Sequence, residues 1–108
     1  MPVKLPQIIK QYVDASNEHD VKSILSCFSE KAIVRDEREE HRGKKAIESW
    51  SEKTIQKYKF HFKPLGIKKE TVGIVVGMEV SGTFPGSPVS IHYHFTIKDE
   101  KILSLTIN

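Results

Sequence analysis

The sequence predicts an α+β domain in which helices pack on one face of an antiparallel sheet. Two periodicities lead to this prediction. In the first half, apolar residues recur at steps of three and four, which is the period of an amphipathic helix. In the second half, apolar and polar residues alternate along segments separated by turn residues, which is the period of a half-buried strand. No linker or repeat divides the 108 residues, so we expect one domain over residues 1–108.

The first half is predicted to hold three helices and one strand. The first helix runs from about residue 5 to residue 16, with an apolar stripe of Leu5, Ile8, Ile9, Tyr12 and Val13. Asp20 is a favourable N-cap for a second, short helix with the stripe Val21, Ile24, Leu25 and Phe28. "SEK" at 29–31 ends that helix, and a strand follows. Gly43 introduces a third helix, with one side formed by Ala46, Ile47, Trp50, Thr54 and Tyr58.

The second half is predicted to hold four strands. "KFHFKPLGIKKE" contains Pro64 and Gly66, which indicate a bent or edge strand. "TVGIVVGMEVSGTF" has one apolar face of Val72, Ile74, Val76, Met78 and Val80. "PGSP" has the residues of a turn, and "VSIHYHFTIK" then places on one face Val89, Ile91, Tyr93, Phe95 and Ile97. "DEK" is predicted to be a tight hairpin before the last strand, "ILSLTIN".

Composition narrows the class of protein. The net charge is +3, but 17 basic and 14 acidic residues are interleaved, which is typical of a solvated surface and not of a nucleic-acid-binding one. No apolar run is long enough to cross a membrane, and the N-terminus lacks the apolar core of a signal peptide. The single cysteine, Cys27, allows no internal disulfide and suits a reducing compartment. We therefore expect a cytoplasmic protein that binds neither membrane nor nucleic acid.

One acidic residue is out of place in the stretch "AIVRDEREEH" at 32–41. Side chains alternate along a strand, so Asp36 shares a face with Ala32 and Val34, which a sheet would bury. Two interpretations stay open. Asp36 either looks into a pocket, where it would serve as a general base, or lies at the strand end, where it is solvated or pairs with an arginine, for which the chain offers Arg35, Arg38 and Arg42.

The order of elements resembles the nuclear-transport-factor-2-like superfamily, which includes ketosteroid isomerases and SnoaL-like polyketide cyclases. The resemblance covers nearly the whole chain and is carried by "YVDASNEHD", "FSEKAIVRDE", "HRGKKAIESW" and "FTIKDEKILSL". It implies a cone-shaped α+β fold, with about three N-terminal helices on a curved, mostly antiparallel sheet that encloses a pocket. Because the superfamily includes enzymes, binding modules and assembly domains, the resemblance is more informative about fold than about chemistry.

Similarity to the ketosteroid isomerases implies roles for individual residues. Tyr12 falls at that family's oxyanion-hole tyrosine, Asp36 at its general base, and Trp50 at an aromatic residue of its pocket. The second oxyanion donor is either His94 or Tyr93, depending on a one-residue shift in the alignment. The apolar face of that strand favours Tyr93, and neither candidate is the acid that the family has there. The implied chemistry is proton transfer next to a carbonyl, without a cofactor.

The same residues allow a function without turnover, as a small-ligand-binding module or as a dimeric assembly module of the same fold. Tyr12 and Trp50 also suit a buried core, and a pocket for a small carbonyl compound would be lined by Tyr12, Trp50, Met78, Tyr93 and Phe95. The charged stretch "DEREEHRG" suggests a smaller or more polar ligand than a steroid.

Two further predictions concern the outer sheet face and the cysteine. His92 and His94 share the outer face of the sheet, where we expect a homodimer interface. Two histidines, even with His61 or Glu79, are a weak metal signal, so we predict no metal. Cys27 is predicted to be a structural thiol.

Overall fold

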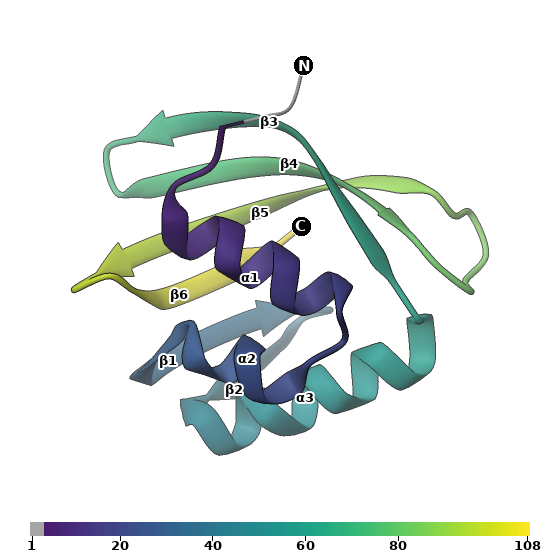
Figure 1. Ribbon diagram of the computed structural model, residues 1–108, viewed down its shortest axis with the longest axis horizontal. Helices are drawn as coiled ribbons and strands as arrows, with labels where there is room; N and C mark the ends of the chain where they lie inside the picture. Colours follow the sequence, from purple (N-terminus) through teal and green to yellow (C-terminus); the bar gives the residue numbers. More distant parts are fainter. Residues whose placement is uncertain (1–3) are drawn as a thin grey trace.

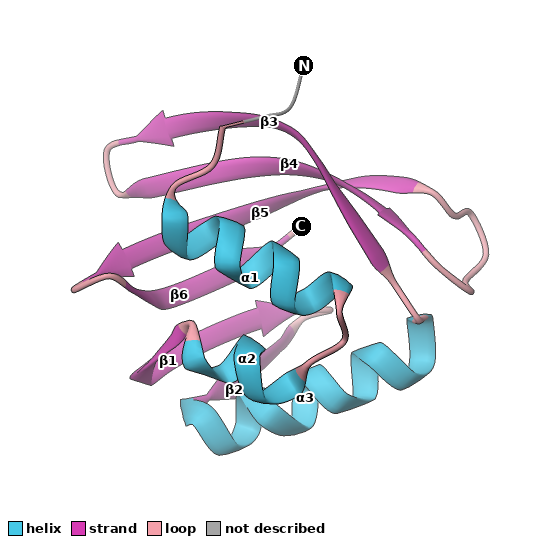
Figure 2. Ribbon diagram, in the orientation of Figure 1, coloured by secondary structure: helices cyan, strands magenta, loops and turns pink. Residues whose placement is uncertain are grey.

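A computed structural model describes residues 4–108 and shows three helices packed on a six-stranded sheet (Figure 1). The elements in chain order are α1 (Gln7–Asn17), α2 (Val21–Ser26), β1 (Phe28–Asp36), β2 (Glu39–Arg42), α3 (Gly43–Tyr58), β3 (His61–Glu70), β4 (Gly73–Ser81), β5 (Val89–Lys98) and β6 (Lys101–Ile107). Figure 2 shows helices and strands segregated into two layers, as the sequence predicts for an α+β fold.

The sheet is mixed and open, with the strand order β2-β1-β6-β5-β4-β3. Every pairing is antiparallel except that of β1 with β6, which joins the N-terminal half of the chain to its C-terminal strand. β3 is an edge strand whose register shifts between Pro64 and Gly66, which confirms the prediction made from those two residues.

The structure corrects the boundary between α2 and β1. The helix ends at Ser26, and Phe28 is the first residue of the strand, not part of the helix stripe. The reason is tertiary, because Phe28 pairs with Ile102 on β6, far away in the sequence. β2 was also missed, because its residues are all polar or charged and give no apolar alternation.

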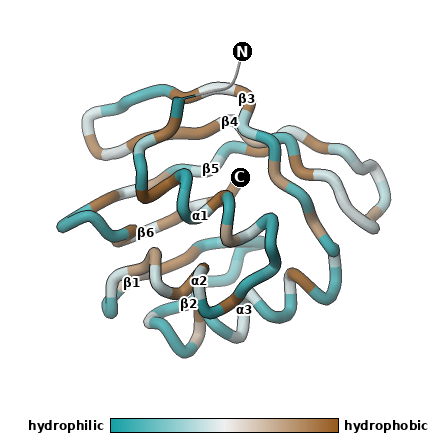
Figure 3. Tube along the Cα trace, in the orientation of Figure 1, coloured by the Kyte–Doolittle hydropathy of each residue, from teal (hydrophilic) through white to brown (hydrophobic). Residues whose placement is uncertain are grey.

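The hydrophobic core lies between the helices and the inner face of the sheet. The alternation on β4 and β5 is confirmed, since Val76, Met78, Tyr93 and Phe95 are all buried. Figure 3 shows the resulting mixture of brown and teal segments along the strands. Val72 was placed on the same face wrongly, because it lies in the β3–β4 turn and is 82% exposed.

Three local features hold the helices in place. The Asp20 side chain caps α2 by accepting a hydrogen bond from the Ser23 amide at 3.2 Å, as predicted. The Asn17 side chain, at the end of α1, exchanges two hydrogen bonds with the backbone of Phe62 on β3, at 2.7 and 3.0 Å. Lys59 ends α3 in the left-handed conformation, with φ of 47°. The Asn17 hydrogen bonds hold the end of α1 against β3.

No helix within residues 4–108 is long and apolar enough to cross a membrane.

Candidate active site

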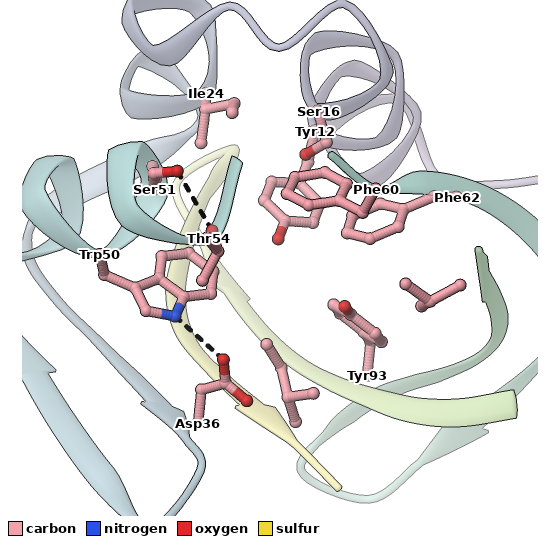
Figure 4. A pocket seen from close by; sticks show the side chains of 12 residues that line it. Tyr12, Ser16, Ile24, Asp36, Trp50, Ser51, Thr54, Phe60, Phe62 and Tyr93 are labelled. Carbon is pink, nitrogen blue, oxygen red and sulfur yellow. Dashed lines mark hydrogen bonds between the residues drawn. The ribbon is translucent and has the colours of Figure 1, made fainter. Parts of the chain in front are cut away.

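Asp36 is the last residue of β1, directly before a two-residue hairpin turn. The turn residues Glu37 and Arg38 both have positive φ, 52° and 66°, which is the geometry of a tight hairpin between β1 and β2. Ala32 and Val34, which share its face, are completely buried. The turn therefore leaves the Asp36 side chain on the inner face of the sheet, where Figure 4 shows it at the edge of a cavity.

The partner of Asp36 is a tryptophan and not an arginine. The indole Nε1 of Trp50 on α3 donates a hydrogen bond to Asp36 Oδ2 at 3.0 Å. Within residues 4–108 no arginine forms an ion pair with Asp36, since both Arg35 and Arg42 pair with Glu40. The interpretation of Asp36 as an arginine-paired acid is therefore wrong.

Burial controls the acidity of Asp36. Loss of solvation raises the pKa of its carboxyl above the ordinary value, and the Trp50 hydrogen bond lowers it by a smaller amount. The negative charge of Glu37 raises the pKa further. Asp36 is thus a stronger base than an exposed aspartate, with one oxygen held by Trp50.

The inner cavity next to Asp36 has a volume of about 50 Å³ and a mostly apolar wall. It lies between the three helices and the strands, and the residues that line it are Tyr12, Ser16, Ile24, Asp36, Trp50, Ser51, Thr54, Phe60, Phe62, Val80, Tyr93 and Ile107. The volume exceeds that of one water molecule and is well below the roughly 150 Å³ of an apolar cavity that accepts benzene. A small chemical group fits in this space, and a fused-ring steroid does not.

Two buried tyrosines share the inner cavity with Asp36. Tyr12 on α1 is 2% exposed and Tyr93 on β5 is 5% exposed. Burial is the main reason that both phenols have a raised pKa, and the charge of Asp36 adds to the shift in both cases. Figure 4 shows both rings facing the cavity. At neutral pH both hydroxyls therefore keep their protons and are available as hydrogen-bond donors.

Three hydroxyl-bearing residues of the cavity wall were not identified from the sequence. These are Ser16, Ser51 and Thr54. Ser16 lies one helical turn after Tyr12, and Ser51 lies one turn after the buried Ile47, so helical spacing could have placed both on inner faces. Serine was overlooked because its small polar side chain does not contribute to an apolar stripe.

A second hollow, which we name the vestibule, opens on the other side of Asp36. Its volume is about 240 Å³, and it is lined by Asp36, Glu37, Glu39, His41, Ser49, Trp50, Lys53, Thr54, Lys57 and Tyr58. The Tyr58 hydroxyl donates a hydrogen bond to Glu37 Oε1, which joins the end of α3 to the β1–β2 turn. The His41 ring lies 6.0 Å from that of Trp50. The charged stretch after Asp36 thus forms part of the vestibule wall.

Other predicted site residues lie elsewhere. Met78 and Phe95 are completely buried in the core, but they line neither the inner cavity nor the vestibule. His94 is on the outer sheet face, where its Nε2 lies 2.9 Å from Asn108 Oδ1, so Tyr93 is the residue that faces inward. Cys27 is 2% exposed, and burial raises the pKa of its thiol.

Among the described residues, no three His, Cys, Asp or Glu side chains are grouped so that they could hold an ion.

Comparison with a family model assigns the chain. Residues 9–105 match the model of the SnoaL-like domain, so the chain belongs to the SnoaL-like family. No protein of the curated set matches this chain.

Solved structures agree with this assignment. A Sinorhizobium meliloti protein, provisionally assigned as a polyketide cyclase, is 36% identical, with a TM-score of 0.92 over 96% of this chain and 95% of its own. A Catenulispora acidiphila protein with a ketosteroid isomerase-like fold, solved with trimethylamine, is 14% identical, with a TM-score of 0.84 over 97% of this chain and 86% of its own. SalBIII, an epoxide hydrolase/cyclase-like enzyme of salinomycin pyran ring formation, is 20% identical, with a TM-score of 0.82 over 94% and 86%.

Proposed function

We propose that this SnoaL-like protein catalyses proton transfer at a carbon next to a carbonyl, with Asp36 as the general base and Tyr12 as the oxyanion donor. The observation that carries the proposal is the Asp36 carboxyl, with its raised pKa and one oxygen held by Trp50, at the edge of a cavity that contains two buried phenols. The likeness to the Sinorhizobium meliloti protein supports a reaction of the cyclase or isomerase type.

The proposed step conserves atoms and charge. Asp36 Oδ1, which Trp50 leaves free, takes the proton from the α-carbon, and the C–H electrons move to form an enolate. The negative charge gathers on the carbonyl oxygen, where the Tyr12 hydroxyl donates a hydrogen bond and Tyr93 supplies a second. Return of the proton from Asp36 to another carbon completes an isomerisation. In a cyclisation the enolate carbon attacks a second carbonyl, and the alkoxide that forms there takes the proton back from Asp36. No cofactor enters this scheme.

The two hollows suggest what kind of substrate is bound. An inner cavity of about 50 Å³ holds a short group that carries the carbonyl, and the vestibule of about 240 Å³ holds a larger, polar remainder. Lys53 and Lys57 as well as Glu37 and Glu39 line the vestibule, so its wall suits a polar molecule and not a hydrocarbon. We therefore propose a small organic carbonyl compound as the ligand.

The test is a screen for hydrogen–deuterium exchange. Small methyl ketones, 2-oxo acids and 1,3-diketones are incubated with the protein in D₂O, and exchange at the α-carbon is followed by NMR. We expect the wild type to accelerate exchange of at least one compound, and Asp36→Asn to lose about 10²- to 10⁴-fold of that acceleration, as removal of a general base does.

A matched variant separates catalysis from a change in fold. Asp14→Asn makes the same chemical change on the exposed side of α1 and should leave exchange unchanged. Binding of a ligand without any Asp36-dependent exchange would favour the alternative function, a non-catalytic binding module, and would contradict the proposal.

We also propose that two copies of the chain pair through the outer sheet face. A shallow hollow of about 400 Å³ on that face is lined by Gly66, Ile67, Lys68, Glu70, Val75, Gly77, His92 and His94. A Cβ added to Gly77 would meet no other atom, so Gly77→Lys places a charge on this face without disturbing the fold. Sedimentation analysis should show a dimer for the wild type and a monomer for the variant, and a monomeric wild type would contradict the proposal.

A further inference from the structure

The Ser51 hydroxyl is buried and has no hydrogen-bond partner among residues 4–108. The residue is 2% exposed. Among the buried side-chain nitrogen and oxygen atoms of the described residues, Ser51 Oγ alone forms no hydrogen bond. Leaving a buried hydroxyl unpaired costs about 1–3 kcal/mol, so such groups are rare in folded proteins and call for an explanation. An alanine at this position of α3 would avoid the cost and would also favour the helix.

The position of Ser51 points to a ligand as the missing partner. Ser51 lines the inner cavity, and it directly follows Trp50, which holds the proposed base. Figure 4 shows Ser51 across the cavity from Tyr12 and Ser16. Thr54, on the next turn of α3, already uses its hydroxyl to bond the Ser51 carbonyl at 3.1 Å, so it does not satisfy Ser51 Oγ.

We propose that Ser51 is a ligand-binding residue whose hydroxyl donates a hydrogen bond to the oxygen of the carbonyl group bound in the inner cavity. This inference rests on the proposed function of the site. It adds a donor from α3 to those from α1 and β5, so that two helices and one strand each supply a hydroxyl to the oxygen. The ketosteroid isomerases have an acid as the second donor to the oxygen, and this chain has none at that place. In the proposed site, three neutral hydroxyl groups bind the oxygen instead.

The test measures binding and stability in the same set of variants. The probe is acetylacetone, a small 1,3-diketone whose enolate absorbs at a wavelength different from that of the neutral forms. Ser51→Ala removes the hydroxyl, and Ser51→Cys keeps the shape of the side chain but supplies a poor donor. Ser90→Ala is the matched control, since Ser90 is exposed on β5 and lines neither the inner cavity nor the vestibule.

We expect both Ser51 variants to bind the enolate about tenfold more weakly than the wild type, which is the usual loss for one hydrogen bond to a charged oxygen. Ser90→Ala should bind as the wild type does. Without ligand, Ser51→Ala should melt at the same temperature as the wild type or higher, because it removes an unpaired buried group. A purely structural serine would give the opposite result, namely a lower melting temperature and unchanged affinity.

The outcomes separate the two proposals. Wild-type binding of the enolate with equal affinity in Ser51→Ala overturns the role of Ser51 and leaves the proposed function in place. If the wild type neither binds acetylacetone nor accelerates exchange of any compound in the screen, both proposals are overturned. If it accelerates exchange of another compound, the same variants are measured with that compound, and equal affinity in Ser51→Ala then overturns the role of Ser51.

Discussion

The two hollows that meet at Asp36 differ in almost every physical respect. The inner cavity is small, has a wall made mostly of aromatic and aliphatic side chains, and contains hydroxyls as its main polar groups. The vestibule is larger and is lined by charged side chains from the β1–β2 turn and from α3. The comparison suggests a division of roles around the Asp36 carboxylate. The apolar wall of the inner cavity raises its pKa, and the charged wall of the vestibule suits the approach of a polar molecule.

The largest effect that distinguishes the two hollows is expected from paired tyrosine variants. Tyr12→Phe in the inner cavity should lower α-proton exchange by about 10²-fold, because it removes a buried donor to the enolate oxygen. Tyr58→Phe makes the same change in the vestibule and should alter exchange by less than about threefold. NMR exchange rates measure both. Equal losses in the two variants would mean that the inner cavity is not the site of chemistry.

The second effect concerns the pH at which Asp36 becomes an active base. Activity should fall as the pH falls through the pKa of Asp36, because only the ionised carboxylate accepts a proton. The Trp50 hydrogen bond lowers that pKa, so Trp50→Phe should raise it further and move the acid limb of the rate profile to higher pH. Titration of ¹³C-labelled aspartate by NMR measures the same shift directly. A limb that stays in place or moves to lower pH would contradict the assignment of Asp36 as the base.

A third, smaller effect is expected in stability. The pKa of Asp36 is higher in the folded chain than in the unfolded chain, so the folded state binds more protons between the two values. At pH values above the pKa that Asp36 has in the folded chain, its ionised carboxylate therefore destabilises the fold. At pH values below the pKa that it has in the unfolded chain, the carboxyl is protonated in both states and this destabilisation is absent. Asp36→Asn should melt at a higher temperature than the wild type at neutral pH, with the difference closing in acid.

The control for this prediction is Asp14→Asn, which removes an exposed carboxylate paired with Lys10 at 2.8 Å and should be neutral or slightly destabilising. A destabilised Asp36→Asn protein at neutral pH would show that the Asp36 carboxylate serves the fold and not a function.

The smallest effect is expected at the mouth of the vestibule. Tyr58→Phe removes the hydrogen bond to Glu37 but keeps the edge-to-face contact with Phe84, whose ring centroid lies 5.6 Å away. Because the bond is exposed, its loss should lower the free energy of unfolding by less than about 1 kcal/mol. Urea unfolding measures the change. A loss of several kcal/mol would mean that this contact, and not the core, holds the β1–β2 turn.

The sequence by itself determined the class of fold and the direction in which several side chains point. Helical and strand periodicities place Tyr12 and Tyr93 on inner faces, because a side chain's direction follows from its position in the repeat. The same rule puts Asp36 in line with Ala32 and Val34, and His94 on the outer face. Asp20 and Pro64 gave correct local predictions, because capping and edge placement depend on neighbouring residues alone.

Only the tertiary structure decided what each inward side chain meets. The bond between Trp50 and Asp36 joins α3 to β1, and the start of β1 depends on pairing with β6, so neither follows from local sequence. Met78 and Phe95 have the same pattern as Tyr93, yet they pack in the core, because the cavity is a gap left by the packing of whole elements. Ser51 shows the same limit, since a buried hydroxyl without a partner is defined by everything around it.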